Sequence, residues 1–460
     1  MPERSVRIAI IGAGPSAFYA AAALIAQDDV AVRVDLFDRL PAPYGLVRYG
    51  VAPDHQRIKS VAALYEKTAS DPRVRFFGCV EFGKDVTIDS LRPLYDMVVF
   101  ATGAQSDRSL GIPGEDLSGS MSATEFVAWY NGHPDYKDLN PDLSVEGVAV
   151  IGVGNVAMDV ARILAKTPDE LKETDIADHA LEALKHSKVR NIYVLGRRGP
   201  AQAKFTNPEI KEFGKLNTAD PVVLEGELEL DPHSAVTVEQ NRMARQNVEI
   251  LREYAARGHG TKTRKVHFRF LVSPTEILGD GKVSGIKIER NKLVSTDDGY
   301  LNANGTGEFE ELNVGMVLRS VGYKGLQVPG MPYDARKGTI PNDHGRILNP
   351  TTGNPIPGAY VVGWAKRGPT GVIGTNKKDA EETVALLLED IPHIRRAGVD
   401  AKVEQKLEEL LEGAGCKYVS FDEWQSFNAL EIERGKSQNR PRVKFIDIEE
   451  MRAAQSEREA

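Results

Sequence analysis

Cysteine is scarce in this chain of 460 residues, where only Cys79 and Cys416 are present. Two cysteines so far apart in the sequence exclude a disulfide scaffold, a Cys-x-x-Cys redox pair and a four-cysteine zinc or iron–sulfur site. We therefore expect no metal centre. Long apolar runs are also missing, so no transmembrane helix is expected. Because the first predicted strand begins at Val6, we expect no leader peptide and a cytoplasmic protein.

An excess of positive charge is absent as well. The chain has 58 Lys and Arg residues against 66 Asp and Glu residues, a net charge of −8, which argues against a general nucleic-acid binder. Hydrophobic residues make up 41% and charged residues 27%, as is ordinary for a soluble globular protein. The length is sufficient for two or three domains with well-buried cores.

The segment from Val6 to Asp38 has the pattern strand, glycine turn, helix, strand. Gly12 permits the tight turn, Gly14 lets a pyrophosphate approach the backbone, and Ala17 lets the helix pack against the strand. The helix N-terminus, which includes Ser16, attracts phosphate groups. The segment therefore predicts a dinucleotide site, although such a turn can also merely join a strand to a helix.

Asp38 ends the second strand, about 20 residues beyond the glycine turn, where a carboxylate can accept hydrogen bonds from a ribose diol. Asp35 is the competing acid, but it lies in the middle of the strand. We interpret Asp35 as a solvated or paired strand residue.

Residues 41–55 contain too much Pro and Gly for a helix or strand, and a long ordered loop at this place usually has a function. A helix is predicted at 59–68, and strands at 74–80 and 95–103. The last strand ends in Thr102 and Gly103, at the carboxyl edge where open α/β sheets bind ligands.

A second fingerprint begins at Val148, and its turn contains Gly152, Val153, Gly154 and Asn155. One such motif is weak evidence, but two in one chain, each between a predicted strand and a predicted helix, imply two dinucleotides. The next strand ends in Arg197 and Arg198, where an NAD site would have an acid. Guanidinium groups match phosphate geometry and so favour the 2′-phosphate of NADP. The alternative is a solvated pair of arginines on a loop.

A basic segment follows within a predicted helix at 236–256 and beyond it. Between residues 242 and 269 there are only two acids, against eight basic residues: Arg242, Arg245, Arg252, Arg257, Lys262, Arg264, Lys265 and Arg269. In an acidic protein this imbalance suggests a docking face, and the alternative is an ordinary solvated helix face.

A third glycine-rich turn runs from Gly363 to Asn376 and opens a helix predicted at 377–388. It predicts another anion site, whose backbone amides could stabilise negative charge on a reduced flavin. Trp364 would shield the ring, or else it is a buried core tryptophan. Beyond residue 400 we expect an amphipathic helix at 403–411 and a polar, frayed end without chemistry.

Five motifs together resemble those of adrenodoxin reductase and its bacterial counterparts, which are FAD-containing ferredoxin–NADP reductases. They are Gly-Ala-Gly-Pro-Ser-Ala, Gly-Leu-Val-Arg-Tyr-Gly-Val-Ala-Pro-Asp-His, Gly-Val-Gly-Asn-Val-Ala-Met-Asp, Gly-Arg-Arg-Gly and Gly-Trp-Ala-Lys-Arg-Gly-Pro-Thr-Gly-Val-Ile-Gly-Thr-Asn. The resemblance covers residues 6–388. It implies an α/β fold with two Rossmann-like domains, in which an NADP domain (108–329) is inserted into a discontinuous FAD domain (1–107 and 330–460).

The resemblance also implies roles for individual residues. Asp38 would bind the adenosine ribose of FAD, where relatives often carry Glu. The remaining FAD contacts would come from Leu46, Val80, Trp364, Gly371, Val372 and Ile373, and the NADP contacts from Gly152, Val153, Gly154 and Asn155 at the pyrophosphate, Arg197 and Arg198 at the 2′-phosphate and Glu209 at the nicotinamide end. His55 and Asp159 match a His and an Asp that the family brings together near the flavin.

The implied reaction is hydride transfer from NADPH to flavin N5, followed by transfer of single electrons to an acidic iron–sulfur ferredoxin. His55 and Asp159 would tune or relay protons, and Arg242 and Arg245 would dock the ferredoxin. The alternatives are an NADPH-dependent disulfide or quinone reductase (a diaphorase), a flavin-binding regulator without turnover, and a subunit of a larger complex. A disulfide reductase would need a cysteine pair that this chain lacks.

Overall fold

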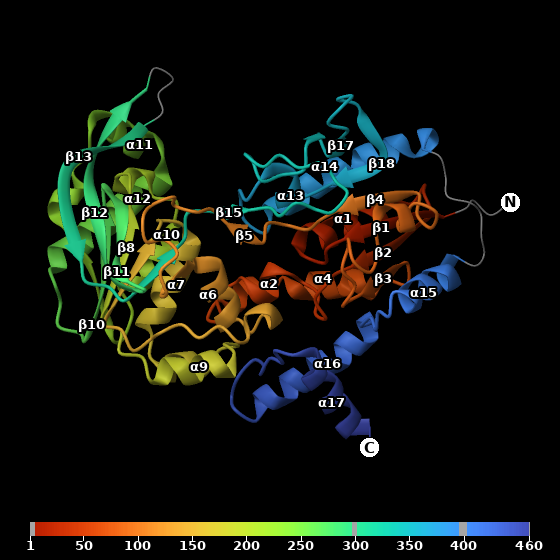
Figure 1. Ribbon diagram of the computed structural model, residues 1–460, viewed down its shortest axis with the longest axis horizontal. Coiled ribbons are helices and arrows are strands. Elements are labelled where there is room, and N and C mark those ends of the chain that lie inside the picture. The colour runs from red at the N-terminus through yellow and green to blue at the C-terminus, as the bar shows by residue number, and fades with distance from the viewer. Residues whose placement is uncertain (1–4, 297–300, 395–402, 460) are drawn as a thin grey trace.

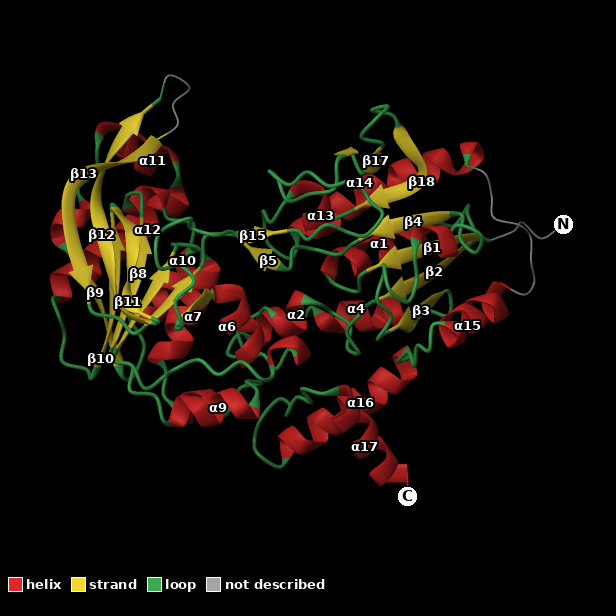
Figure 2. Cartoon of the chain, viewed as in Figure 1, coloured by secondary structure: helices red, strands yellow, loops and turns green. Residues whose placement is uncertain are grey.

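The computed structural model describes residues 5–296, 301–394 and 403–459. Within these ranges the chain forms two α/β units that lie side by side (Figure 1). We call the unit built on a seven-stranded sheet the first unit, and the one built on a six-stranded sheet the second unit. Helices cover the sheets of both units (Figure 2). The predicted α/β class with parallel sheets is confirmed.

The first unit takes its strands from both ends of the chain: β1 (Val6–Ile11), β2 (Val32–Phe37), β3 (Val74–Phe77), β4 (Met97–Phe100), β16 (Asn342–Asp343), β17 (Arg346–Leu348) and β18 (Pro355–Val361). Their order is β16-β17-β18-β4-β1-β2-β3, and β18, β4, β1, β2 and β3 are parallel. Because β1 and β18 lie on either side of β4 and point the same way, the first and third glycine turns leave the sheet at one edge.

The helices of the first unit are α1 (Pro15–Ile25), α2 (Leu46–Tyr49), α3 (Gln56–Lys59), α4 (Ala62–Ala69), α5 (Ile88–Leu91), α13 (Trp364–Arg367), α14 (Thr375–Asp390), α15 (Val403–Gly413), α16 (Phe421–Lys436) and α17 (Ile448–Glu459). Helix α1 packs against α4 on one side and α14 on the other. Helix α14 begins at the end of the third glycine turn, so its contact with α1 holds that turn near the first.

The second unit has parallel strands β6 (Ser120–Ser122), β7 (Gly147–Ile151), β8 (Asn191–Gly196), β9 (Ala219–Val223), β10 (Arg264–Phe270) and β14 (Met316–Arg319), in the order β6-β14-β7-β8-β10-β9. An antiparallel sheet adds β11 (Val272–Asp280), β12 (Lys282–Ser295) and β13 (Leu301–Leu312). The helices are α6 (Ala123–Tyr130), α7 (Asn155–Ala165), α8 (Pro168–Leu171), α9 (Asp178–Lys185), α10 (Asn207–Phe213), α11 (Pro232–Gln240) and α12 (Arg242–Arg257).

Two predicted helices are in fact divided, and one predicted loop is partly helical. The helix expected at 59–68 is replaced by the short α3 and by α4, and the one expected at 236–256 by α11 and α12. The second break lies at Asn241, whose extended backbone and side-chain oxygen, accepting from the amides of Met243 and Ala244, start a new helix. Residues 41–55 contain α2, a single turn that begins after Gly45 at φ +48°.

The prediction of a polar, frayed C-terminal end is wrong. Helix α15 confirms the amphipathic helix expected at 403–411, but α16 follows it and buries Trp424 and Phe427 in the core of the first unit. Glu431 of α16 is completely buried, where it forms a bidentate ion pair with Arg48 of α2. The polar composition misled the prediction because these charges are paired inside the protein.

Asp35 is a paired strand residue, as one of the interpretations held. Its carboxylate accepts hydrogen bonds from Arg75 at 2.8 and 2.7 Å and from the hydroxyl of Tyr95 at 2.6 Å.

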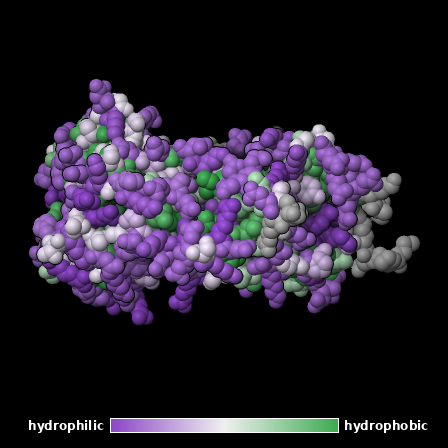
Figure 3. Space-filling view, turned by 90° about the horizontal axis from the view of Figure 1, so that it is seen from below, coloured by the Kyte–Doolittle hydropathy of each residue, from purple (hydrophilic) through white to green (hydrophobic). Residues whose placement is uncertain are grey.

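None of the helices in the described ranges is long and apolar enough to cross a membrane. The surface seen from below is mostly hydrophilic, with apolar side chains gathered near the middle (Figure 3).

Candidate functional site

The first glycine turn lies directly beside the end of β4. Gly12 has φ +104°, and a Cβ atom there would lie 2.5 Å from the carbonyl oxygen of Ala101, so only glycine fits. Thr102 and Gly103 follow Ala101 at this carboxyl edge, where both were predicted to contribute. Gly14 is extended and immediately precedes α1, whose first turn contains Ser16 and Ala17. The amides of this turn and helix start can therefore face a pyrophosphate.

Asp38 closes this turn from the end of β2. One carboxylate oxygen accepts from the amide of Ala13 at 2.7 Å, and the other accepts from the amide of Leu40 at 3.0 Å. Burial raises the pKa of Asp38, although these two hydrogen bonds and Arg39 act in the opposite direction. Each carboxylate oxygen can accept a further bond, so the side chain is positioned to bind a ribose diol.

The loop around Gly45 covers the same turn. A Cβ atom on Gly45 would lie 3.0 Å from the Cα of Gly14, and Leu46 begins α2 at this point. Val80 is buried, and its amide donates to the carbonyl of Asp38 at 2.9 Å. Leu46 thus lies next to the turn and Val80 next to the acid, and their contact with FAD stays a prediction.

The third glycine turn meets the first. A Cβ atom on Gly363 would lie 2.6 Å from the side chain of Ser16, so the two turns are in contact. Trp364 is half-buried rather than a buried core residue, its ring centroid lies 5.3 Å from that of Tyr323, and its indole N–H donates to the carbonyl of Thr370 at 3.2 Å. The residues that complete the turn into α14 are Gly371 (φ +80°), Val372, which is 64% exposed, and Ile373.

The second glycine turn has the same geometry in the second unit. Gly152 has φ +131°, and a Cβ atom there would lie 2.2 Å from the carbonyl oxygen of Ser320. Gly154 precedes α7, which begins with Asn155. The carbonyl of Val153 accepts from the amides of Lys204 and Phe205, and the side-chain oxygen of Asn155 accepts from the amide of Thr206 at 2.9 Å. The loop that follows β8 is therefore tied to this turn.

Arg197 and Arg198 start that loop. Their backbones are fixed by the antiparallel sheet and the residue before it: the Asn291 amide group of β12 donates to the carbonyl of Arg197 at 2.9 Å, and the amide of Leu271, between β10 and β11, donates to the carbonyl of Arg198 at 3.1 Å. The side chain of Arg197 is exposed and that of Arg198 is half-buried. A Cβ atom on Gly196 would lie 2.9 Å from Val153, so both arginines follow directly from the glycine turn.

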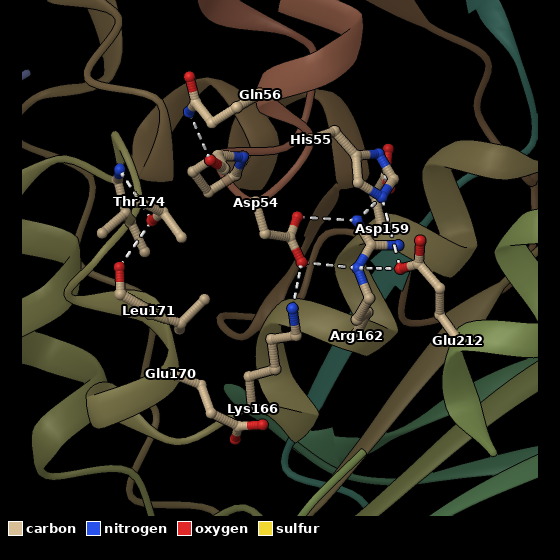
Figure 4. A network of polar contacts seen from close by, with 12 residues as sticks. Asp54, His55, Gln56, Asp159, Arg162, Lys166, Glu170, Leu171, Thr174 and Glu212 are labelled. Carbon is tan, nitrogen blue, oxygen red and sulfur yellow. Dashed lines mark hydrogen bonds and ion pairs between the residues drawn. The ribbon is translucent and has the colours of Figure 1, made fainter. Parts of the chain in front are cut away.

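A charged cluster joins the two units, with Arg162 of α7 at its centre (Figure 4). The Arg162 side chain is completely buried and donates to Asp54 at 2.8 and 2.9 Å and to Asp159 at 2.7 Å. It also pairs with Glu209 at 3.1 Å and with Glu212 at 3.2 Å. A single guanidinium group from the second unit thus holds carboxylates from both units.

His55 of the first unit completes the cluster at the start of α3. Its Nδ1 lies 3.7 Å from Asp159 and 3.9 Å from Glu209, and its Nε2 lies 3.4 Å from Glu212. Burial lowers the pKa of His55, but the hydrogen bond with Glu212 and the nearby carboxylates outweigh burial, so the pKa is raised above 6.5. The structure therefore brings together His55 and Asp159, as predicted, and adds Glu209 to them.

The carboxylates of the cluster differ in proton affinity. Burial, reinforced by the negative charge of Asp159, raises the pKa of Glu209 to about 7. Burial also raises the pKa of Asp159, against the effects of Arg162 and His55. For Asp54, burial is outweighed by hydrogen bonds from Arg162 and Lys166, and its pKa is lowered. At neutral pH, Glu209 can therefore both hold and release a proton.

Four members of the cluster were not predicted as site residues: Asp54, Arg162, Lys166 and Glu212. Asp54 stands next to His55, and Arg162 lies three residues after Asp159 on the same helix face. These spacings were visible in the sequence. The pairing itself was not, because it depends on how the two units meet.

Two groups of ligand-type side chains in the described residues lie close enough together to hold a metal ion: Asp54, His55 and Glu212, and His55, Asp159 and Glu209. Arg162 and Lys166 already place positive charge among these carboxylates. A divalent cation would have to displace or oppose them, so the absence of a metal from this protein stays our prediction.

Many of the positive side chains in the basic segment (residues 242–269) have partners within the protein. Arg269 pairs with the buried Glu227 and with Glu310, and Lys265 pairs with Asp220 at 3.0 Å. Lys262 lies 3.7 Å from the same Asp220, and Arg264 donates to carbonyls at the end of α7. Arg245 is exposed but donates to the carbonyls of Val238 and Glu239 at the end of α11. The exposed excess of charge is therefore confined mainly to α12.

The two cysteines are neighbours in space. The thiol of Cys416 donates to the carbonyl of Cys79 at 3.1 Å, and both are free cysteines. Burial raises the pKa of Cys79 to about 11 and also raises that of Cys416. Neither thiol has the depressed pKa of a disulfide-exchange nucleophile.

Comparisons with known proteins agree with this geometry. A family model described as pyridine nucleotide-disulphide oxidoreductase matches residues 6–194. The chain is 47% identical to NADPH-ferredoxin reductase FprA of Mycobacterium tuberculosis, over 97% of this chain and 98% of that protein. It is 43% identical to the mitochondrial NADPH:adrenodoxin oxidoreductase of Arabidopsis thaliana, over 98% of this chain and 96% of that protein.

A solved structure, Mycobacterium tuberculosis FprA in complex with NADPH, has the same fold. The similarity has a TM-score of 0.93 at 46% sequence identity, and it covers 98% of this chain and 100% of that chain. The match therefore includes both units.

Proposed function

The chain belongs to the adrenodoxin reductase-like family, and from this membership we propose that it is an FAD-containing oxidoreductase that carries electrons between NADPH and an iron–sulfur ferredoxin. The observation that carries the proposal is the placement of three glycine turns. Two of them meet in the first unit, the other lies in the second unit, and the cluster around His55 and Arg162 lies where the units join.

The residues of the first unit fit FAD. Gly12 and Gly45 let the backbone pack closely around the phosphate-binding turn, because a side chain at either position would meet Ala101 or Gly14. Asp38 lies where it can bind a ribose, and the third turn supplies Trp364 and the start of α14 at the flavin end. The residues of the second unit fit NADP, with Arg197 and Arg198 beside its glycine turn for the 2′-phosphate. FAD, once bound, accepts a hydride and releases its electrons one at a time.

The chain's own residues supply position and protons. Glu209 orients the nicotinamide end, and the His55 imidazole with the Asp159 carboxylate holds or moves a proton near the ring that accepts the hydride. Arg162 fixes both carboxylates by direct hydrogen bonds. Glu212, which is 39% exposed, links His55 toward the surface.

The division into domains remains part of the proposal. We place the FAD domain at residues 1–107 and 330–460 and the NADP domain at 108–329. Two crossings of the chain then connect them, near β5 (Ser106–Asp107) and β15 (Tyr323–Lys324), which pair with each other. We also place the protein in the cytoplasm, in agreement with its lack of a membrane-crossing helix in the described ranges.

The docking face for ferredoxin is proposed at the start of α12. Arg242 is exposed there, and Arg245 is exposed while it caps α11. An acidic partner would be attracted to this end of the helix and oriented by it. Because Arg245 also supports α11, Arg242 is the cleaner residue for a test.

The rival functions differ in what they require. A disulfide reductase requires a reactive cysteine pair near the flavin, whereas Cys79 and Cys416 have raised pKa values. A quinone reductase or diaphorase would use NADPH without a protein acceptor, and a flavin-binding regulator would not turn over. A subunit of a larger complex would show its acceptor activity only with its partners present.

One experiment separates these functions. The purified protein is examined for a flavin spectrum and then mixed with NADPH and a low-potential ferredoxin, or with ferricyanide or a quinone instead. Reduction of ferredoxin at a rate comparable to that of the small acceptors supports the proposed function. Reduction of the small acceptors alone favours the diaphorase, and no NADPH oxidation with any acceptor favours the regulator.

A further inference from the structure

The segment between α16 and α17, residues 437–447, reaches from the first unit to the second, and we call it the C-terminal strap. Its two ends belong to the first unit, where Trp424 of α16 and Met451 of α17 are part of one buried core. Its middle touches the segment after α6 and the segment before α9 of the second unit. No residue of the strap was expected to have a role.

Three side chains of the strap bind the second unit. Arg440, which is 6% exposed, donates to the carbonyls of Thr174 and Ile176 and to the carboxylate of Asp178. Lys444 donates to the backbone carbonyl and side-chain oxygen of Asn131 at 3.1 and 3.2 Å. Asp447 pairs with Lys137. These contacts span almost the whole length of the strap.

Lys444 also joins the two units through a buried group of charges. Its ammonium lies 3.5 Å from Asp175 of the second unit and donates to the carbonyl of Arg48 in the first unit at 3.3 Å. Lys59 of α3 donates to the same Asp175 at 2.7 and 2.8 Å and to Asn131 at 3.3 Å. Burial lowers the pKa of both lysines. Lys59 lies one helical turn after His55, so this group is attached to the element that carries the site histidine.

The covalent connection between the units lies on another side of the molecule. β5 and β15 form a ribbon of only two residue pairs, Tyr323 with Asp107 and Lys324 with Ser106. This ribbon lies at the upper edge of the junction in Figure 2, whereas the strap follows the lower edge beneath α2 and beside α9. A two-stranded ribbon this short resists bending weakly. Contacts at the opposite edge, together with the cluster around Arg162, therefore restrain rotation of one unit against the other.

We propose that the C-terminal strap is a positioning element for hydride transfer, in which Lys444 and Arg440 hold the second unit against the first so that the nicotinamide and flavin sites keep a fixed separation. The proposal rests on the proposed function, because it requires one nucleotide site in each unit. Hydride transfer depends steeply on the distance between the reacting atoms, and a misplacement of 1 Å can cost about 100-fold in rate. Neither side chain contacts a glycine turn; Lys444 reaches only the carbonyl of Arg48 in α2 of the first unit, and Arg440 contacts none of the proposed nucleotide residues. An effect of Arg440→Gln would therefore be on position alone.

The test compares Lys444→Met and Arg440→Gln with the parent holoenzyme. Lys444→Met leaves Asp175 paired with Lys59, so no buried carboxylate loses its only partner, and the variant is expected to fold. The matched control is Arg346→Met, which removes an ion pair with Asp390 that lies wholly within the first unit. FAD content, the NADPH dissociation constant and the stopped-flow rate of flavin reduction at saturating NADPH are measured for each protein.

We expect both strap variants to keep one FAD per chain and an NADPH dissociation constant within about threefold of the parent, while the saturating rate of flavin reduction falls about tenfold or more. The control should retain the parent rate. Backbone hydrogen exchange, measured with and without FAD, should accelerate in residues 131–137 and 174–178 in the strap variants, which is a readout independent of turnover.

Other outcomes overturn the proposal. A reduction rate within twofold of the parent in Arg440→Gln, with exchange unchanged, shows that the strap only covers the surface. A rate loss that merely follows a loss of FAD shows a role in folding of the first unit. If the Lys444→Met protein cannot be purified in folded form, the rate and exchange measurements on Arg440→Gln alone test the proposal. A parent protein that binds FAD but is not reduced by NADPH contradicts the proposed function instead of the role of the strap.

Discussion

Replacing Arg162 by methionine gives the sharpest test of the charged cluster. Arg162 is completely buried and donates hydrogen bonds to Asp54, Asp159 and Glu209 at 2.7–3.1 Å. Methionine keeps the unbranched apolar stem but removes the guanidinium group, with its charge, its donors and its volume. Breaking a buried ion pair by removing one partner costs about 3–5 kcal/mol, because the remaining charges are left uncompensated. Lys166 still binds Asp54, so we expect the lower part of this range.

The penalty should depend on pH. Glu209 has a pKa of about 7 in the folded protein, raised above the value of 4.5 that applies when it is unfolded, so it binds a proton more readily when folded. Its contribution to stability therefore decreases as the pH rises from about 4.5 to about 7. Arg162 opposes this rise in the pKa of both Glu209 and Asp159. Without Arg162 the pKa values of both carboxylates rise further, so the pH range over which stability is lost extends to higher pH. Relative to the parent protein, the variant should therefore lose more stability near pH 8 than near pH 6.

The assay is urea unfolding of the parent and of Arg162→Met at pH 6 and pH 8, with the same excess of FAD in every sample. Arg162→Lys, which keeps the charge but not the fork of donors, should lie between the two proteins. Lys166→Met serves as a control, because the Lys166 ammonium pairs with Asp54 alone among the described carboxylates, and its loss should cost about 1 kcal/mol. A penalty for Arg162→Met that is equal at both pH values, or larger at pH 6, would refute this reasoning.

Four further predictions concern cofactors and partner. The purified protein should contain one FAD per chain, and a colourless protein that cannot be reconstituted with FAD would contradict the assignment of the first unit. Arg197→Ala should weaken NADPH binding by about tenfold to a hundredfold, since a charged hydrogen bond contributes about 1.5–3 kcal/mol; NADH binding should barely change, and an equal loss of both cofactors would mean that Arg197 is structural. Turnover with ferredoxin should fall steeply as salt rises, because exposed charges are screened over about 10 Å at 0.1 M, while turnover with ferricyanide should change far less. Arg242→Glu should raise the apparent KM for ferredoxin without slowing flavin reduction by NADPH in stopped-flow, and parent-like ferredoxin reduction at low salt would place the docking face elsewhere.

The nucleotide sites could be predicted from the sequence because their turns require glycine at particular backbone positions. Gly12 and Gly152 adopt positive φ values and face backbone carbonyls at distances that no side chain tolerates, so the turn needs glycine wherever it occurs. Asp38 and the arginine pair follow at spacings set by the length of a strand–helix–strand unit. The α/β class and the resemblance to the adrenodoxin reductase family rested on such local patterns. The comparisons confirm both.

Short-range patterns were less reliable where polarity alone was used. The end of the chain was expected to be frayed because it is polar, yet Glu431 and Lys444 are buried there with partners from distant segments. The basic segment was expected to be exposed, yet Arg269 lies between Glu227 and Glu310. A charge in a sequence does not reveal whether its counter-charge lies in water or in another element.

The sequence by itself determined the glycine turns and the acid and the arginines that follow them, because each depends on its own segment of backbone. His55 and Asp159 were predicted only through the resemblance to the family. Only the tertiary structure placed Arg162 among four carboxylates, joined Glu209 to His55, and brought Lys59, Asp175 and Lys444 together. Apart from Arg162 with Asp159, these pairs come from segments far apart in the chain. Their energies depend on burial and on distances of a few ångströms, which are set only when the two units pack against each other.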